Sequence, residues 1–446
     1  MTLTSGPTRR LAEFFAAATW DDVPAHVKHE AKRSLVNYFA CALGGCRDDA
    51  VEATSRVLRR FAGAATSTVI GRGERLDALS AAFVNAASAN VFDFDDTHLY
   101  TVLHPTAPVA AALFALAEAR RMSGRDLLLA FALGVEAECR VGNAVSPGHY
   151  RRGWHITSTC GVFGAAAAAG KVLGLDAERF VWALGDASAQ AGGLLETLGT
   201  MAKSISVGNA ARNGLAAAMY AAEGVFGPAE PLAGTYGFLR VTGNEWDASR
   251  LDSGLGRSWE LASNTYKLYP VGIVLSPVIE ACFALRERVD AAAIERVAIA
   301  GHPLLRERTD RVHPTSGREA QVSAQHAVAV VFARGRAGLA EFDDAAANDA
   351  ALRPLREKVQ VIDDARCPVE SVTVSVQLRG GGTFTQRVES ARGSSARPLT
   401  DDDLERKLRD LVEFGGSTCD VPRLIEAIWN IDETQDAGAI TALASN

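Results

Sequence analysis

The chain has 446 residues, of which 48% are hydrophobic and 22% charged, a composition typical of a globular protein with a large core. Its net charge of -7 argues against the basic surface that nucleic acids or anionic membranes require. Seven cysteines occur without a C-x-x-C pair, so neither a disulfide framework nor a structural zinc site is expected. We find no signal peptide and no unbroken apolar stretch, and therefore expect a cytoplasmic protein without a membrane contact.

Helical periodicity dominates the first half of the chain. Amphipathic segments over residues 11–62 precede a short extended piece at 67–70, and Gly71-Arg72-Gly73 then predicts a turn rather than a phosphate loop, because a third glycine is missing. Small residues on the faces of the following helices let their axes approach closely, which indicates a compact helical domain. These helices are predicted at Asp77–Ala89, Pro108–Arg121, Asp126–Val141 (capped by Ser123), Thr157–Leu173, Ala177–Ala191 and Ala210–Glu223.

The pattern changes near residue 260. Alternating residues predict a strand at Ile294–Gly301, and Val372–Leu378 followed by a glycine turn and residues 383–385 predicts a hairpin, with a helix at Ser323–Arg334 between them. A capped helix starting at Thr400 returns the chain to helical texture. The expected fold is mainly α with a smaller α+β domain: a helical domain over 1–263 to which 394–446 return, and an inserted α+β domain over 264–393.

An acidic stretch stands out between two alanine-rich runs. Asp93, Asp95 and Asp96 fall within four positions, and His98 and His104 follow closely. Clustered carboxylates in apolar surroundings are costly, and such groups occur more often at working sites than in scaffolding. The alternative interpretation of Asp95 and Asp96 is structural, as caps of the next helix or partners of backbone groups.

Four blocks carry a family resemblance. They occur in order along nearly the whole chain, and the chain resembles the MmgE/PrpD family, which includes 2-methylcitrate dehydratases, cis-aconitate decarboxylases and iminodisuccinate epimerase. The blocks are Asp93-Phe-Asp-Asp-Thr97 with His104-Pro105, Gly153-Trp-His-Ile-Thr-Ser-Thr159, Lys203-x-x-x-x-Gly-Asn-Ala-Ala211, and Lys267-x-Tyr-Pro270.

The resemblance implies a large helical domain built from both chain ends, a smaller α+β lid, a cleft between them and a homodimer. It also implies cofactor-free and metal-free chemistry on small di- or tricarboxylates. The residues it assigns to catalysis are Asp93, His104, His155 and Lys203, and those it assigns to substrate binding, or that stand near its binding positions, are Thr97, Ser206, Lys267, Tyr269 and Ser276.

The sequence departs from the pattern at two places. Many members carry histidine where this chain has Ser206, and a histidine just after the K-x-Y-P block, where this chain has Val271, Gly272 and, further on, Ser276. Serine neither titrates near neutral pH nor carries positive charge. The departures leave the resemblance intact and bear on which reaction is catalysed.

Reactions of this family develop negative charge on a carbon beside a carboxylate. Such a site needs cations or donors for the carboxylates, a base and an acid. Lys203 supplies a point charge, His104 and His155 are the residue type that exchanges protons near neutral pH, Asp93 can orient a histidine, and Thr97 can donate a hydrogen bond.

The leading hypothesis is a lyase, either a dehydratase or a decarboxylase. The main alternative is an epimerase of an α-substituted dicarboxylate, which needs only removal and return of one proton. Ser206 and Ser276 in place of titrating histidines favour this alternative. A metal enzyme using the Asp93–His104 stretch lacks a recognisable ligand spacing. A family member that binds carboxylates without turnover is the remaining alternative.

Overall fold

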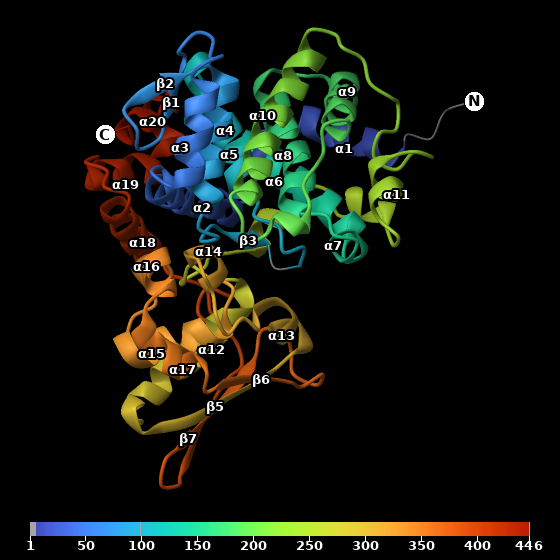
Figure 1. The fold of residues 1–446 in the computed structure, drawn as a ribbon. Coiled ribbons are helices and arrows are strands. Elements are labelled where there is room, and N and C mark those ends of the chain that lie inside the picture. Colours follow the sequence, from blue (N-terminus) through green and yellow to red (C-terminus); the bar gives the residue numbers. More distant parts are fainter. Residues whose placement is uncertain (1–5, 99, 446) are drawn as a thin grey trace. The chain divides into compact units, whose positions relative to one another are not determined.

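The computed structural model describes residues 6–98 and 100–445, and its contacts divide the chain into two compact units (Figure 1). The larger unit comprises the residues up to Val91, 95–264 and those from Thr400 onward. The smaller unit comprises Phe92–Phe94 and Thr265–Leu399. Helices build the larger unit, and a four-stranded sheet with covering helices lies in the smaller one. The predicted fold class, mainly α with a smaller α+β part, is confirmed.

The larger unit is a helical assembly in which short strands serve only as connections. Its strands are β1 (Ser67–Val69), β2 (Glu74–Leu76) and β3 (Thr97–His98). Its helices are α1 (Pro7–Ala17), α2 (Ala25–Gly45), α3 (Asp49–Leu58), α4 (Ala78–Asn90), α5 (Thr106–Ala119), α6 (Gly124–Val145), α7 (Gly148–Arg151), α8 (Ile156–Val172), α9 (Ala177–Ser188), α10 (Ala202–Ala222), α11 (Phe238–Thr242), α18 (Asp401–Phe414), α19 (Val421–Trp429) and α20 (Ala439–Leu443).

Helix α8 lies at the centre of the larger unit. Every residue from Ile156 to Gly170 is buried, and α5, α6, α9 and α10 all pack against it. Glycine allows α10 to approach closely, because a Cβ built on Gly214 would lie 2.4 Å from the carbonyl oxygen of Val162. Although α8 is apolar, no helix in the described part of the chain is long and apolar enough to cross a membrane.

The C-terminal helices pack against the N-terminal part of the chain, as the red and blue segments of Figure 1 show. Helix α18 contacts α2, where Lys407 donates to the Asn37 side chain at 2.9 Å. Thr400 and Asp403 form the reciprocal capping box that begins α18, with distances of 3.0 and 3.2 Å. The capped helix predicted at Thr400 is therefore confirmed.

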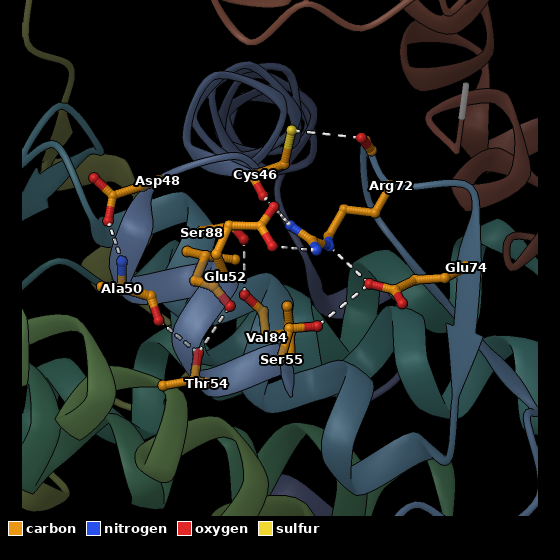
Figure 2. Close-up of polar contacts among 12 residues, drawn as sticks. Cys46, Asp48, Ala50, Glu52, Thr54, Ser55, Arg72, Glu74, Val84 and Ser88 are labelled. Carbon is orange, nitrogen blue, oxygen red and sulfur yellow. Dashed lines mark hydrogen bonds and ion pairs between the residues drawn. The ribbon is translucent and has the colours of Figure 1, made fainter. Parts of the chain in front are cut away.

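The turn between β1 and β2 is held by a buried arginine (Figure 2). The Arg72 side chain is 3% exposed and donates to Glu52 at 2.7 and 3.0 Å, to Glu74 at 2.7 Å and to the Cys46 carbonyl at 2.7 Å. Charged and carbonyl acceptors on several sides compensate the desolvation of the guanidinium. The prediction of a turn at Gly71-Arg72-Gly73 is confirmed, and both glycines have positive φ.

The smaller unit is built on a mixed sheet of order β6-β5-β7-β8, with β5 and β6 parallel and the other pairs antiparallel. Alternate residues of β7, such as Val372, Val374 and Val376, are buried in a core shared with α12 and α15. The predicted strand, hairpin and helix of this part are confirmed. The elements are α12 (Ser276–Arg286), β5 (Ile294–Gly301), α13 (Pro303–Thr309), α14 (Gly317–Ala320), α15 (Ala324–Arg334), α16 (Asp344–Ala347), α17 (Arg353–Arg356), β6 (Val359–Asp363), β7 (Val372–Leu378) and β8 (Thr383–Val388), with β4 (Asn264–Thr265) where the chain passes from one unit to the other.

Several predicted helix boundaries are wrong, among them the end of α9, which lies at Ser188 instead of Ala191. Helix α5 begins at Thr106, so Pro108 is the third helical residue instead of the first; a proline is tolerated there because the first-turn N–H groups lack intrahelical partners. Helix α6 runs beyond the predicted end to Val145. Helix α10 begins at Ala202, eight residues early, because packing stabilises the segment 202–209, in which Ser204, Ser206, Gly208 and Asn209 have lower helix propensity than alanine.

The close contact of α8 and α10 gives a stability prediction. Replacing Gly214 with alanine places a methyl group 2.4 Å from the Val162 oxygen and 2.5 Å from the Ala165 Cβ, so backbone must shift. We expect a loss of about 2 kcal/mol in unfolding free energy, although alanine is the better helix former. Urea denaturation measures it, with Gly192→Ala as control, since nothing lies within 4 Å of a Cβ at that position. An unchanged stability of Gly214→Ala would contradict the packing argument.

Candidate active site

The predicted site residues divide between the two units. Thr97, His104, His155, Lys203 and Ser206 belong to the larger unit. The smaller unit contains the others, namely Asp93, Lys267, Tyr269 and Ser276. The acidic stretch itself passes from one unit to the other, since Phe92–Phe94 group with the smaller unit and the chain from Asp95 onward with the larger.

A tight turn brings His104 to the start of α5. The His98 amide donates to the Leu103 carbonyl at 2.8 Å, and Val102 takes a φ of 55°. Positive φ is costly for a β-branched residue, and such strain is found where surrounding structure enforces a particular geometry. Pro105 then occupies the N-cap position of α5, and the His104 amide donates to the Thr157 hydroxyl on α8 at 3.2 Å. The turn therefore fixes His104 against the N-terminal end of α8.

The His104 ring is oriented through Nδ1. This atom lies 2.8 Å from the Asp96 carbonyl oxygen and 3.2 Å from Asp95 Oδ1, with the Thr97 hydroxyl further away at 3.5 Å. The first two neighbours can only accept a hydrogen bond when Asp95 is ionised, so Nδ1 carries the hydrogen. In the neutral ring, Nε2 is then the nitrogen with the lone pair.

The larger unit also contains two buried acids, Asp96 and Glu138. Asp96 Oδ2 accepts hydrogen bonds from Thr106 at 2.5 Å and Asn264 at 2.6 Å, so Asp96 bonds to side chains and does not cap α5. Burial, reinforced by the charge of Asp95, raises the pKa of Asp96 to about 6. Burial and then the charge of Asp96 raise the pKa of Glu138 well above its ordinary value, and neither Glu138 carboxyl oxygen has a hydrogen-bond partner among the described residues.

His155 stands at the N-cap of α8 and is 4% exposed. Its Nδ1 lies 2.6 Å from the Ser158 hydroxyl, which lies 2.6 Å from the Ser206 hydroxyl on α10. Ser206 in turn donates to the carbonyl oxygen of Lys203 at 2.7 Å. Lys203, in the first turn of α10, is 8% exposed. The packing of α8 on α10 thus brings His155, Ser206 and the Lys203 backbone together.

The smaller unit holds Asp93 in an unusual conformation. Asp93 has a φ of 52°, and Lys267 Nζ contacts both its carbonyl oxygen at 2.7 Å and its Oδ2 at 3.0 Å. Gln321 donates to the neighbouring Phe92 carbonyl at 3.0 Å. The predicted residues Asp93 and Lys267 are therefore partners. Tyr269 stacks on Phe283 at a ring separation of 6.2 Å, and Ser276 is the buried first residue of α12.

Two other histidines near the blocks have structural surroundings. His98 is buried and contacts Thr101 at 3.0 Å and Glu260 at 3.2 Å. His149 contacts Thr159 at 2.7 Å and stacks on Trp154, and burial lowers its pKa to about 4. The partners of both histidines described here belong to the larger unit.

Comparisons with known proteins cover both units. The MmgE/PrpD N-terminal domain matches residues 9–251, and the MmgE/PrpD C-terminal domain matches residues 269–433. The chain belongs to the MmgE/PrpD family. Among its relatives, the cis-aconitate decarboxylase of Homo sapiens is 29% identical, covering 98% of this chain and 94% of its own. The cis-aconitate decarboxylases of Mus musculus and Aspergillus terreus are each 28% identical, covering 93% and 98% of this chain, and 88% and 96% of their own.

Sequence reasoning missed three residues that support this site. Ser158 stands inside the Gly153–Thr159 block but was given no role, whereas it bonds to His155. Asn264 bonds to Asp96 and Gln321 to the Phe92 carbonyl, from positions far along the chain. No spacing rule connects such distant partners; only the three-residue interval from His155 to Ser158 at a helix start could have been recognised.

Asp96 gives a pH prediction. A carboxyl with a folded pKa of about 6 and an ordinary value of 3.8 binds its proton more tightly in the folded state. Its contribution to stability is therefore lost as pH rises through this range. The asparagine of Asp96→Asn stays neutral, so the variant does not lose this stability as pH rises. The unfolding free energy of the variant minus that of wild type should therefore increase by about 2 kcal/mol between pH 4.5 and 7.5.

Chemical denaturation across this pH range measures the difference. The exposed Asp402→Asn on α18 is the matched control and should show a constant difference. A constant difference for Asp96→Asn as well would contradict the assigned burial of its charge.

Proposed function

We propose that this protein is a lyase that removes carbon dioxide from a small tricarboxylate of the cis-aconitate type. The observation that carries the proposal is the similarity, over almost the entire chain, to proteins named cis-aconitate decarboxylase. Two geometric features support it. The Nδ1 atoms of His104 and His155 both contact protein oxygens, and the His104 backbone bonds to Thr157 in the first turn of α8, the helix that His155 precedes.

Decarboxylation breaks the bond between a carbon and its carboxylate and releases carbon dioxide. The electron pair left behind delocalises through the adjacent double bond toward a remaining carboxylate, and one proton is added to carbon. The site must hold the remaining carboxylates with positive charge or hydrogen-bond donors and must supply that proton. In this proposal Lys203 offsets the developing charge, and His155 and His104 move the proton through Nε2.

The other assignments form part of the same proposal. Asp93 completes the catalytic group, held in place by Lys267. Thr97, Lys267, Tyr269, Ser206 and Ser276 are proposed to line the substrate position. Lysine and imidazole can provide the positive charge and the proton, so the proposed reaction uses no metal or organic cofactor.

Proton NMR in deuterated water on cis-aconitate and related di- and tricarboxylates tests the reaction. We expect carbon dioxide loss with one deuterium incorporated, unaffected by exhaustive chelation. Lys203→Met should lower kcat/KM by about 10²-fold or more, since the lysine charge is removed from the transition state. Lys28→Met, which removes a lysine placed over Trp20 in the larger unit, is the control.

The alternative outcomes are distinct. Exchange at a carbon beside a carboxylate without loss of carbon dioxide would identify an epimerase, the reading favoured by Ser206 in place of histidine. Loss of water would identify a dehydratase. Binding seen by calorimetry without turnover would leave a carboxylate-binding protein. Any of these replaces the decarboxylase proposal, and dependence on an added metal would overturn cofactor independence.

The homodimer implied by the family remains a prediction. Several large apolar side chains of the larger unit are exposed near the C-terminal end of α10, including Tyr220 at 49% and Phe226 at 80%. Burial of such groups between two copies is favourable. Light scattering on the purified protein should give twice the 47.1 kDa chain mass. A monomeric mass at micromolar concentration would refute this prediction.

A further inference from the structure

A chain of hydrogen bonds connects the α10 backbone with the ring of His155. It passes from the Lys203 carbonyl oxygen to the Ser206 hydroxyl at 2.7 Å, to the Ser158 hydroxyl at 2.6 Å and to His155 Nδ1 at 2.6 Å. The direct separation between Ser206 and His155 Nδ1 is 3.5 Å, so Ser158 is the closer partner of the ring. Hydroxyl groups have one proton each, and the order of the groups therefore determines the direction of every bond.

The direction follows from the carbonyl end. A carbonyl oxygen can only accept, so the single Ser206 proton points to Lys203. Ser206 can then only accept in its bond with Ser158, so the single proton of the Ser158 hydroxyl points to the Ser206 oxygen. The Ser158 oxygen can only accept from His155, and Nδ1 must carry a hydrogen.

We propose that Ser158 and Ser206 are positioning residues that hold His155 as the Nδ1–H tautomer, so that Nε2 is the nitrogen that exchanges the proton with substrate. The catalytic use of that nitrogen rests on the proposed function, whereas the tautomer rests on the hydrogen-bond chain alone. Both serines remain uncharged across the working pH range, so they orient the ring without adding a second titrating group.

The backbone is shaped to keep Ser158 in place. The His155 amide donates to the Gly193 carbonyl at 3.0 Å, and Gly193 has a φ of 137°. A Cβ on Gly193 would lie 2.6 Å from Ser158 Cβ and 3.0 Å from its hydroxyl oxygen. Only glycine leaves room for the Ser158 side chain between His155 and Ser206. Close packing of α8 and α10 fixes the other side of this hydroxyl.

Removing the Ser206 hydroxyl should reverse the direction of the hydrogen bond between Ser158 and His155 Nδ1. In Ser206→Ala the Ser158 proton loses its acceptor and can turn to His155 Nδ1. The neutral ring then carries its hydrogen on Nε2, where it cannot accept a proton. The other residues proposed to line the substrate position are retained, so kcat should fall by about 10-fold or more, a larger change than any rise in KM. Ser206→Thr retains the hydroxyl and should restore most of kcat.

The tautomer can be measured without substrate. In protein labelled with ¹⁵N at its nine histidines, long-range proton–nitrogen correlation spectra distinguish Nδ1–H from Nε2–H rings. His155→Gln identifies the His155 signals. Ser188→Ala on α9 is the matched control. Like Ser206, Ser188 donates to the carbonyl oxygen three residues earlier in its helix, that of Gly185, at 2.7 Å, but it belongs to no hydrogen bond with a histidine described here. Spectra are recorded above the pH at which the His155 signals show the ring to be neutral.

We expect an Nδ1–H ring in wild type, Ser188→Ala and Ser206→Thr, and a shift toward Nε2–H in Ser206→Ala. Ser158→Ala, which removes the closer partner, should also lose the pure Nδ1–H signal. An Nε2–H ring in wild type would overturn the proposal, and so would a Ser206→Ala protein with wild-type spectra and kcat. If no carboxylate is turned over, the proposed function fails while the spectra still decide the tautomer.

Discussion

The close approach of α8 and α10 is the constraint on which the histidine arrangement depends. Gly214 lets the backbones approach until a methyl group would no longer fit against Val162. At this separation the Ser158 and Ser206 hydroxyls, one from each helix, come within 2.6 Å. A larger side chain in this contact would move one helix and break the hydroxyl pair. Packing of small residues therefore helps to determine the orientation of the His155 ring.

The same principle holds His104 by different means. Its Nδ1 contacts a main-chain carbonyl and a carboxylate, whereas His155 contacts a hydroxyl. In both arrangements Nδ1 is the ring nitrogen that contacts these protein oxygens. The strained backbone at Val102 and the bond from His104 to Thr157 tie the first ring to the helix that begins beside the second.

Local patterns predicted the fold class, the hairpin at Val372–Leu378 and the capped start of α18, because alternation, turns and caps are encoded by neighbouring residues. They failed at the start of α10, where tertiary packing stabilises the segment 202–209 despite its two serines, glycine and asparagine. The motif blocks predicted candidate site residues, but not the partners of these residues. Lys267 contacts Asp93 across 174 positions of the chain, and Asn264 contacts Asp96 across 168. Local sequence patterns do not connect segments so far apart.

The hydrogen bonds of Ser206 change the interpretation of this residue. From the sequence, losing a histidine there removed a proton donor and favoured an epimerase. In the structure the Ser206 proton is directed to a backbone carbonyl and its oxygen to Ser158, so the position takes part in holding His155. A site whose proton transfer uses His155 and His104 does not require a titrating group at 206. Under the proposed function, the serine at position 206 therefore gives no reason to prefer an epimerase.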